Sequence, residues 1–367
     1  MSDATAGRER TGNPDAELIA DLGHRIDDAL KVALDGATEV ALVNFHGWAN
    51  GWPRWVGNPG DMAIWLGTLA SLRRLGVRVA YQCAYNTLSL PALRRAVPHG
   101  PVLITGGGDF GDLYTFGTPE TRERLLAELR GVRLIQLPIA AYFRHQPNID
   151  RLRRLVTEHN NFVLMVRDQL SETRAREQLD ADIRLVPDMA FGLGPLARPQ
   201  PPDVDVLWNT WRPEDPEYVD HGPPPDGITT RTIEWASRTG VEPRWRGDRR
   251  AARRAHLVLG RWMGRWPSTH APLWRAYAAT FAPLCHGSVD RGLRLESSGR
   301  VLVTNKLHGH VFAVLAGIPH VVLDNSFGKV SGLFQTWTRT SGNAHWADDG
   351  PAARAIALDL LRSVDVV

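Results

Sequence analysis

The stretch RVLVTNKLHGHVFAVLAGIPHVVLD, residues 300–324, decides the fold class of this chain. RVLVT (300–304) and HVVLD (320–324) are short apolar runs that predict buried strands, and residues 307–317 between them predict a helix. Strands of this kind, buried on both faces and separated by helices, are typical of parallel sheets. The loops that follow the two strands then open onto the same edge of the sheet.

The same alternation extends through most of the 367 residues. The first half predicts strands at 39–45, 77–83, 101–105, 132–138, 162–166 and 183–188, with helices near 15–34, 61–76, 89–97, 118–131, 148–159 and 171–179. The second half predicts strands at 205–210 and 228–235 as well, and helices at 271–285 and 350–363. Between the strand at 228–235 and the helix at 271–285, the region 244–266 is rich in Arg and Trp and has no predicted element.

A proline-rich stretch, GPLARPQPPDV (194–204), interrupts the alternation and is the best candidate for a linker. We therefore predict an α/β protein with two Rossmann-like domains, each with a parallel sheet, facing each other across a cleft. The domains are predicted at 1–195 and 203–349, and the helix within 350–367 is expected to pack back on the first domain. Ligands of such sheets bind beyond the carboxyl ends of the strands.

Composition limits the class of protein. The net charge of +3 comes from 43 basic and 40 acidic residues, and no basic stripe with interleaved aromatic residues suggests a nucleic-acid partner. The two cysteines, Cys83 and Cys285, form no CxxC pair and are expected to be buried thiols. The polar beginning of the chain and the absence of a long apolar run predict a cytoplasmic protein without a transmembrane segment.

Lysine is rare in this arginine-rich chain and occurs only at Lys31, Lys306 and Lys329. Two of these three follow predicted strands, in the loops that also carry His308 and Asp324. His308 starts a helix, whose positive end favours the neutral imidazole, and a neutral imidazole can accept a proton. The alternative is that His308 only caps the helix.

Two further loops follow strands and carry polar residues. The glycine-rich run GGGDFGD (106–112) predicts a loop with close backbone approach, or simply a tight turn between strand and helix. MVRDQLS (165–171) places Arg167 where it could hold a carboxylate, or pair only with Asp168.

The motifs GNPGDMAI, GGGDFGD, VRDQLS, VPDMAF and NKLHGHVFAVLAGIPHVVLDNSFGKV, with Trp337 downstream, occur in an order and spacing that resembles the polysaccharide pyruvyl transferase family. The resemblance covers about residues 40–340. It implies a GT-B-like fold and the transfer of enolpyruvate from phosphoenolpyruvate to two sugar hydroxyls. The product would be a pyruvate ketal on a cell-surface glycan, formed without a metal or cofactor.

This resemblance implies a site in which His308 is the acid–base residue and Asp109 or Asp112 orients or deprotonates the acceptor. Phosphoenolpyruvate carries a phosphate and a carboxylate, so several cations should gather around it. The residues expected to bind substrates are Arg167, Lys306, Lys329, Ser171, Gly107, Gly108, Asn325, Asp61 and Trp52. The tryptophans of HGWANGWPRWVGN (46–58) could line a sugar platform, or they could pack between the domains.

The chain departs from the family pattern at Lys306, where Arg is usual before Leu-His. Lysine has no bidentate fork, so the strength and geometry of phosphate binding at this position are open. Two other readings stay open: a GT-B-like glycosyltransferase that uses a nucleotide sugar, and a binding protein that has lost activity. The expected partners are phosphoenolpyruvate and a saccharide acceptor, free or lipid-linked, with peripheral membrane contact left open and no nucleic acid.

Overall fold

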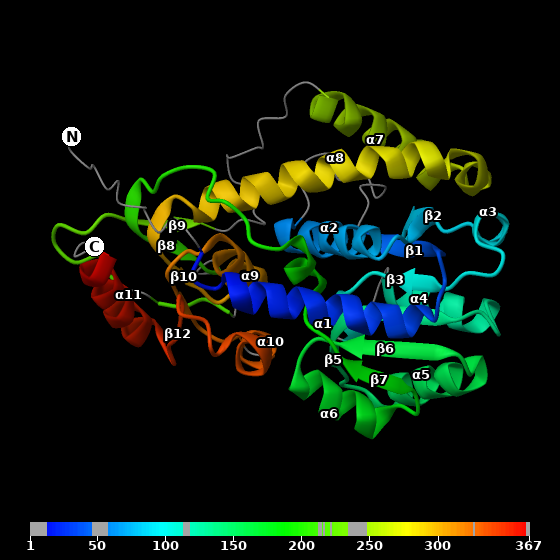
Figure 1. Ribbon diagram of the computed structural model, residues 1–367, viewed down its shortest axis with the longest axis horizontal. Helices are drawn as coiled ribbons and strands as arrows, with labels where there is room; N and C mark the ends of the chain where they lie inside the picture. The colour runs from blue at the N-terminus through cyan, green and yellow to red at the C-terminus, as the bar shows by residue number, and fades with distance from the viewer. Residues whose placement is uncertain are drawn as a thin grey trace, which may run out of the picture.

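The structure is a computed structural model, and it describes residues 13–45, 58–112, 118–211, 215, 217–220, 222–233, 248–325 and 327–364. Within these ranges the chain forms two parallel sheets and eleven α-helices, so the predicted α/β class is confirmed (Figure 1). No helix of this part of the chain has both the length and the apolar character needed to cross a bilayer.

The first sheet comes from the first half of the chain and has the strand order β2-β1-β3-β5-β6-β7, with β4 paired to β5. Its strand pairs are all parallel, which requires a crossover connection between paired strands. The strands are β1 (Glu39–Phe45), β2 (Arg78–Ala84), β3 (Val102–Ile104), β4 (Gly107–Gly111), β5 (Leu134–Tyr142), β6 (Phe162–Val166) and β7 (Asp182–Leu185).

Strand β4 differs from the loop that the glycine-rich run predicts. β3 pairs with the beginning of β5, and β4 pairs with its end, at Ile139, Ala141 and Tyr142. One long strand therefore carries two short ones in succession. Gly111 makes this close pairing feasible, because its φ is +113° and a Cβ there would lie 1.9 Å from the carbonyl oxygen of Tyr142.

The second sheet has the order β12-β11-β10-β8-β9 and is also parallel throughout. The predicted strand–helix–strand unit at 300–324 is present as β10, α9 and β11. Of the five strands of this sheet only β12 was not predicted, because AHW (344–346) contains no apolar run. The strands are β8 (Val204–Asn209), β9 (Thr230–Ile233), β10 (Gly299–Thr304), β11 (His320–Val322) and β12 (Ala344–Trp346).

Helices cover both faces of each sheet, and this produces three apolar cores. The first core lies between the sheets and joins α1, α2, α8 and α9 to the inner faces of both. The second and third cores cover the outer faces, against α3–α6 and α11. The helices are α1 (Ala16–Leu34), α2 (Pro59–Arg74), α3 (Leu90–Ala96), α4 (Thr118–Glu128), α5 (Gln146–His159), α6 (Gln169–Gln178), α7 (Asp248–Arg265), α8 (His270–Glu296), α9 (Leu307–Ala316), α10 (Lys329–Leu333) and α11 (Gly350–Val364).

Helix α8 is much longer than the predicted 271–285 and extends from the first sheet to the second (Figure 1). It contacts α3, β2 and α2 at the first sheet and α9 at the second. The interior Pro283 does not end it, because packing on both sides holds the helix. The two sheets share this helix and one core, and the division into domains at 195 and 203 stays a prediction.

The predicted position of the C-terminal helix is wrong. Instead of returning to the first sheet, α11 packs on β10 and β11. Its apolar residues Ala353, Ala357 and Leu361 join Val301 and Val321 in the outer core of the second sheet. The physical reason is that this face of the second sheet has no other helix to bury it among the described residues.

Candidate active site

His308 lies in the first turn of α9, just beyond the end of β10. Its imidazole packs against the first turn of α2: a Cβ built on Gly60 would lie 2.3 Å from His308 Cγ and Nδ1. Only glycine at this position lets the two helix starts meet. Because each helix start carries partial positive charge, an anion in this place would be stabilised.

Asp188 is the nearest acidic partner of His308. The Oδ2 atom of Asp188 lies 3.5 Å from His308 Nε2, within ion-pair distance but long for a hydrogen bond. Asp188 is fully buried and also accepts hydrogen bonds from Arg167 Nη1 at 2.9 Å and from the amide of Ala190 at 2.9 Å. Burial alone would raise the pKa of Asp188, but the charges of His308 and Arg167 and these hydrogen bonds outweigh it and hold that pKa well below the usual value.

Arg167 and Lys329 converge on the backbone of Gly108 in β4. A Cβ built on Gly108 would lie 3.5 Å from both Arg167 Nη2 and Lys329 Nζ. Burial, followed by the positive charge of Arg167, lowers the pKa of Lys329 to about 8, against the nearby acids, among them Asp109. Two cations held this close to each other favour a bound anion, which would offset their repulsion.

Neighbouring residues fix these two cations in place. The indole Nε1 of Trp337 donates a hydrogen bond of 2.7 Å to the carbonyl oxygen of Arg167. Asn325 Oδ1 accepts from the amides of Phe327 and Lys329, both at 3.3 Å, and so shapes the turn before α10. Trp337 and Asn325 therefore act on the cations through the backbone.

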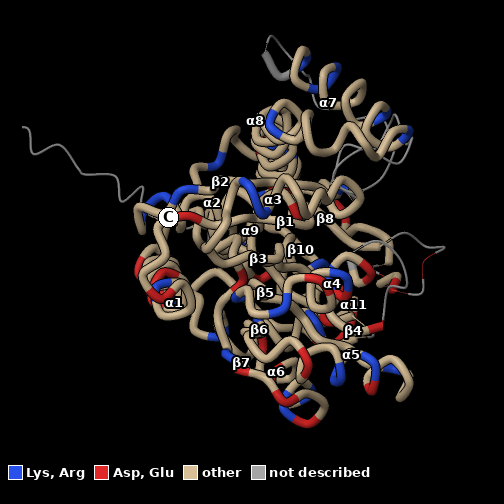
Figure 2. Tube along the Cα trace, turned by 90° about the vertical axis from the view of Figure 1, so that its right-hand side faces the viewer, with Lys and Arg blue, Asp and Glu red and all other residues tan. Residues whose placement is uncertain are grey.

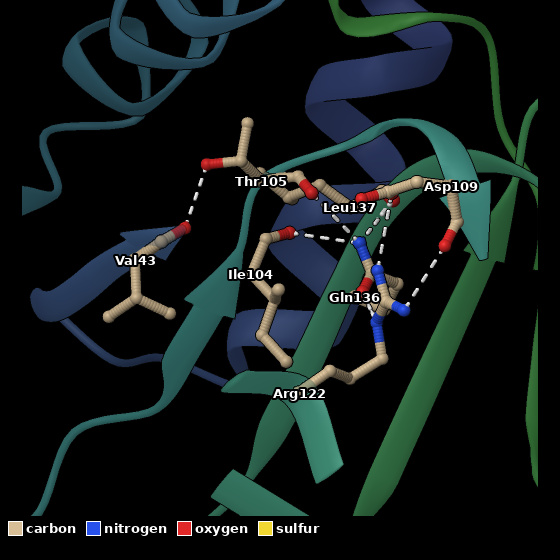
Figure 3. A network of polar contacts seen from close by, with 7 residues as sticks. All are labelled: Val43, Ile104, Thr105, Asp109, Arg122, Gln136 and Leu137. Atoms are coloured by element: carbon tan, nitrogen blue, oxygen red, sulfur yellow. Dashed lines mark hydrogen bonds and ion pairs between the residues drawn. The ribbon is translucent and has the colours of Figure 1, made fainter. Parts of the chain in front are cut away.

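Asp109 is held beside this cluster by a buried polar network (Figure 3). Arg122 forms an ion pair of 3.3 Å with the Asp109 carboxylate and donates to Gln136 Oε1 at 2.7 Å. Gln136 in turn donates to the carbonyl oxygens of Ile104 and Thr105. The network ties β4 to β3 and β5, and it leaves Asp109 as a paired carboxylate next to Lys329.

Asp112 and Ser171 have local partners that organise helices. The Asp112 carboxylate accepts from the amides of Arg144 and His145, at 2.6 and 2.8 Å, and from Asn148 Nδ2 at 3.1 Å, all at the start of α5. Ser171 Oγ donates to Asp168 Oδ2 and accepts from the amide of Ala141. These contacts are typical of helix caps. They indicate a structural role for Asp112 and Ser171 and give no sign of a catalytic or binding one.

Lys306 belongs to a second polar group, on the side of the second sheet. Its Nζ lies 4.3 Å above the ring of Trp211, and its charge acts on Glu296, the last residue of α8. Glu296 is fully buried and accepts from Asn209 Nδ2 at 2.8 Å. Burial raises the pKa of Glu296 well above its usual value, while Asn209 and Lys306 lower it.

The remaining predicted residues are less informative. Asp61 is half-buried in the first turn of α2, next to Gly60, and Gly107 opens β4 with a φ of +150°. Trp52 lies outside the described residues, as do the other two tryptophans of its loop.

Comparison with known proteins identifies the family. The model of the family described as polysaccharide pyruvyl transferase matches residues 58–326, which include Gly60, Gly108, Arg167, Asp188 and His308. The chain belongs to this family. It is 29% identical over 286 residues to EpsO of Bacillus subtilis, provisionally named a pyruvyl transferase, with 77% of this chain and 82% of EpsO covered. It is 26% identical to pyruvyl transferase 1 of Schizosaccharomyces pombe, over 82% of this chain and 70% of that protein.

A solved structure supports the fold. The crystal structure of an uncharacterized protein from Klebsiella pneumoniae superposes with a TM-score of 0.53 and 14% identity, covering 89% of this chain and 98% of that one. Membership of this family, together with these relatives, identifies the protein as a transferase.

Sequence reasoning missed Asp188 and Gly60 as parts of the site. The signal for Asp188 was present, because this acid is the last residue of the predicted strand 183–188 and stands in VPDMAF (186–191). Gly60 stands in GNPGDMAI, one residue before the predicted Asp61, but a glycine offers no side chain to attract notice.

Proposed function

We propose that this family member transfers the enolpyruvyl group of phosphoenolpyruvate to two hydroxyls of a sugar in a cell-surface glycan or glycolipid precursor, forming a pyruvate ketal and releasing phosphate. The observation that supports it best is the convergence of Arg167 Nη2 and Lys329 Nζ on Gly108, with the His308–Asp188 pair joined to Arg167. A donor with a phosphate and a carboxylate on three carbons needs cations for its two anionic groups and an acid beside them.

The cations would hold the donor. Arg167 Nη1 is engaged by Asp188, and its Nη2 faces Gly108 beside Lys329. The bare backbone of Gly108 allows an anion to come into contact with both cations, and the starts of α2 and α9 add partial positive charge. A buried, compact ammonium such as Lys329 suits a phosphate oxygen.

The His308–Asp188 pair would handle the proton. Asp188 stabilises a protonated imidazole, which gives its proton to the methylene carbon of phosphoenolpyruvate and turns it into a methyl group. The neighbouring carbon becomes an electrophile, and a sugar hydroxyl forms a bond to it while returning a proton to His308. The bond from this carbon to the phosphate oxygen then breaks, a second hydroxyl closes the ketal, and its proton leaves with the phosphate.

The reaction as proposed uses no metal or organic cofactor. The two carboxylates nearest the cations, Asp109 and Asp188, are each paired with an arginine, Arg122 and Arg167. In this scheme charge is neutralised by Arg167 and Lys329, and the acid is an imidazole.

The test is phosphate release from phosphoenolpyruvate by the purified protein with a panel of nitrophenyl and lipid-linked sugars, with the ketal identified by NMR. Thermal stabilisation by phosphoenolpyruvate, but not by UDP or GDP, would separate this reading from a nucleotide-sugar glycosyltransferase. Donor binding without turnover on any acceptor would favour a binding protein. Stabilisation by a nucleotide alone would overturn the proposal.

A further inference from the structure

Helix α7 packs on α8 and lies on the side of α8 that faces away from the rest of the fold (Figure 1). Its inward side holds His256, Gly260 and Met263, all buried. His256 stacks on Tyr277 of α8 with ring centroids 4.2 Å apart, and its Nδ1 lies 2.7 Å from Thr280 Oγ1. His270 Nε2 lies 2.9 Å from the carbonyl oxygen of Met263 at the end of α7. We call α7 with the turn to α8, residues 248–270, the α7 hairpin.

The outward side of the hairpin carries large apolar side chains. Val258, Trp262 and Trp266 are 56%, 60% and 54% exposed, and they are three of the five large apolar residues that are exposed in the described part of the chain. Val258 and Trp262 stand four residues apart and so share a face of α7. Trp262 in the last turn of α7 and Trp266 just after the helix leave a large area of apolar surface in water.

Arginines line the same outward side. Arg254, Arg261 and Arg265 are exposed and follow one another at intervals of seven and four, which places them in a row beside Val258 and Trp262. The guanidinium of Arg265 lies 5.1 Å from the ring centre of Trp266. Figure 2 shows basic residues along α7.

The charge around the hairpin is unusual for this chain. Residues 248–289 contain seven arginines and one acidic residue, Asp248, although the whole chain has 43 basic and 40 acidic residues. A helix with an arginine row next to exposed tryptophan and valine has the composition of helices that lie in the interface of an anionic bilayer. Tryptophan prefers the headgroup level, and arginine pairs with lipid phosphate.

We infer that the α7 hairpin docks the protein on the surface of a membrane containing anionic phospholipid, with Trp262 and Trp266 inserted at headgroup depth and Arg254, Arg261 and Arg265 on lipid phosphates. A second copy of this chain fits the surface poorly, because a symmetric contact would bring two arginine rows together. The inference does not depend on the proposed reaction, since it concerns where the protein binds.

The experiment is flotation of the full-length protein with vesicles of phosphatidylcholine alone and with vesicles that also contain phosphatidylglycerol. The wild type is expected to float with the anionic vesicles and to be released by high salt. Trp262→Ser with Trp266→Ser, and Arg254→Gln with Arg261→Gln and Arg265→Gln, should each lower the partition coefficient by about tenfold or more.

Matched controls separate this surface from overall charge and apolarity. Arg130→Gln with Arg176→Gln and Arg362→Gln removes the same charge from exposed arginines elsewhere, and Val32→Ser removes another exposed apolar side chain. These variants should float like the wild type, and melting curves should show that every variant is folded.

Three outcomes would overturn the inference. The first is a wild type that does not float with anionic vesicles. The second is a pair of hairpin variants that float as well as the controls. The third is binding of a single-stranded oligonucleotide as tight as that of vesicles and equally sensitive to the tryptophan substitutions, which would assign the hairpin to a polyanion other than lipid.

Discussion

Replacing Lys329 by Met tests the anion site most directly, because methionine keeps much of the length and removes the charge. A hydrogen bond to a charged group is worth about 1.5 to 3 kcal/mol, which corresponds to about a 10- to 150-fold rise in the KM for phosphoenolpyruvate. The matched control is Lys31→Met, since Lys31 is exposed on α1 and far along the chain from the site.

The pH dependence gives a second, independent readout. The pKa of Lys329 is lowered to about 8, chiefly by burial and then by Arg167, so the ammonium is charged below this pH and neutral above it. The kcat/KM for phosphoenolpyruvate in the wild type should therefore fall as pH rises through about 8. This fall should be smaller in Lys329→Met, which has no ammonium to lose its proton.

Stability should change in the opposite direction to activity. A lysine whose pKa falls from 10.5 to about 8 on folding destabilises the folded state at pH 7, by up to about 3 kcal/mol at about 1.4 kcal/mol for each pKa unit. The sign follows because the unfolded chain holds this proton more tightly. Lys329→Met should thus melt at a higher temperature than the wild type at pH 7, and the gain should vanish as pH rises from 8 to above 10.5.

The reasoning would be refuted by a Lys329→Met variant with wild-type kcat/KM. It would also be refuted if the fall through about pH 8 is as large in that variant as in the wild type. Steady-state phosphate release between pH 6 and 10, with calorimetric melting of both proteins over the same range, covers both outcomes.

His308→Ala and Asp188→Asn should each reduce kcat by about 10² to 10⁴ with little change in KM. The measurement is phosphate release by folded variants, and full activity in either one would remove the pair from the mechanism. Activity should survive EDTA; loss on chelation that Mg²⁺ or Mn²⁺ restores would count against the proposed chemistry. Lys306→Arg and Lys306→Ala should both raise the KM for phosphoenolpyruvate, and the Ala variant should also melt at a lower temperature because Glu296 loses its nearby cation. An Arg variant that uses donor better than the wild type would show that Lys306 is a loosened site.

Local sequence pattern determined the elements that carry the site. The apolar runs at 300–304 and 320–324 and the helix between them could be predicted because a buried strand needs apolar residues on both faces, whatever surrounds it. The positions of His308, Arg167 and Lys329 beyond strand ends follow from the same pattern. This places Arg167 at the carboxyl edge of the first sheet, and His308 and Lys329 at the carboxyl edge of the second.

Tertiary structure alone decided which of these residues meet and what each one contacts. Asp188 and His308 are 120 positions apart in the chain, and only the packing of α9 against Gly60 of α2 brings the imidazole to the end of the first sheet. The same packing assigns Asp112 to the start of α5 and Lys306 to Trp211 and Glu296. Sequence pattern reports the environment along one element, whereas side-chain partners depend on how elements pack across two sheets. The α7 hairpin is a further example. Its arginines and tryptophans can be seen in the sequence, but which of these side chains are exposed depends on the face of α7 that α8 covers.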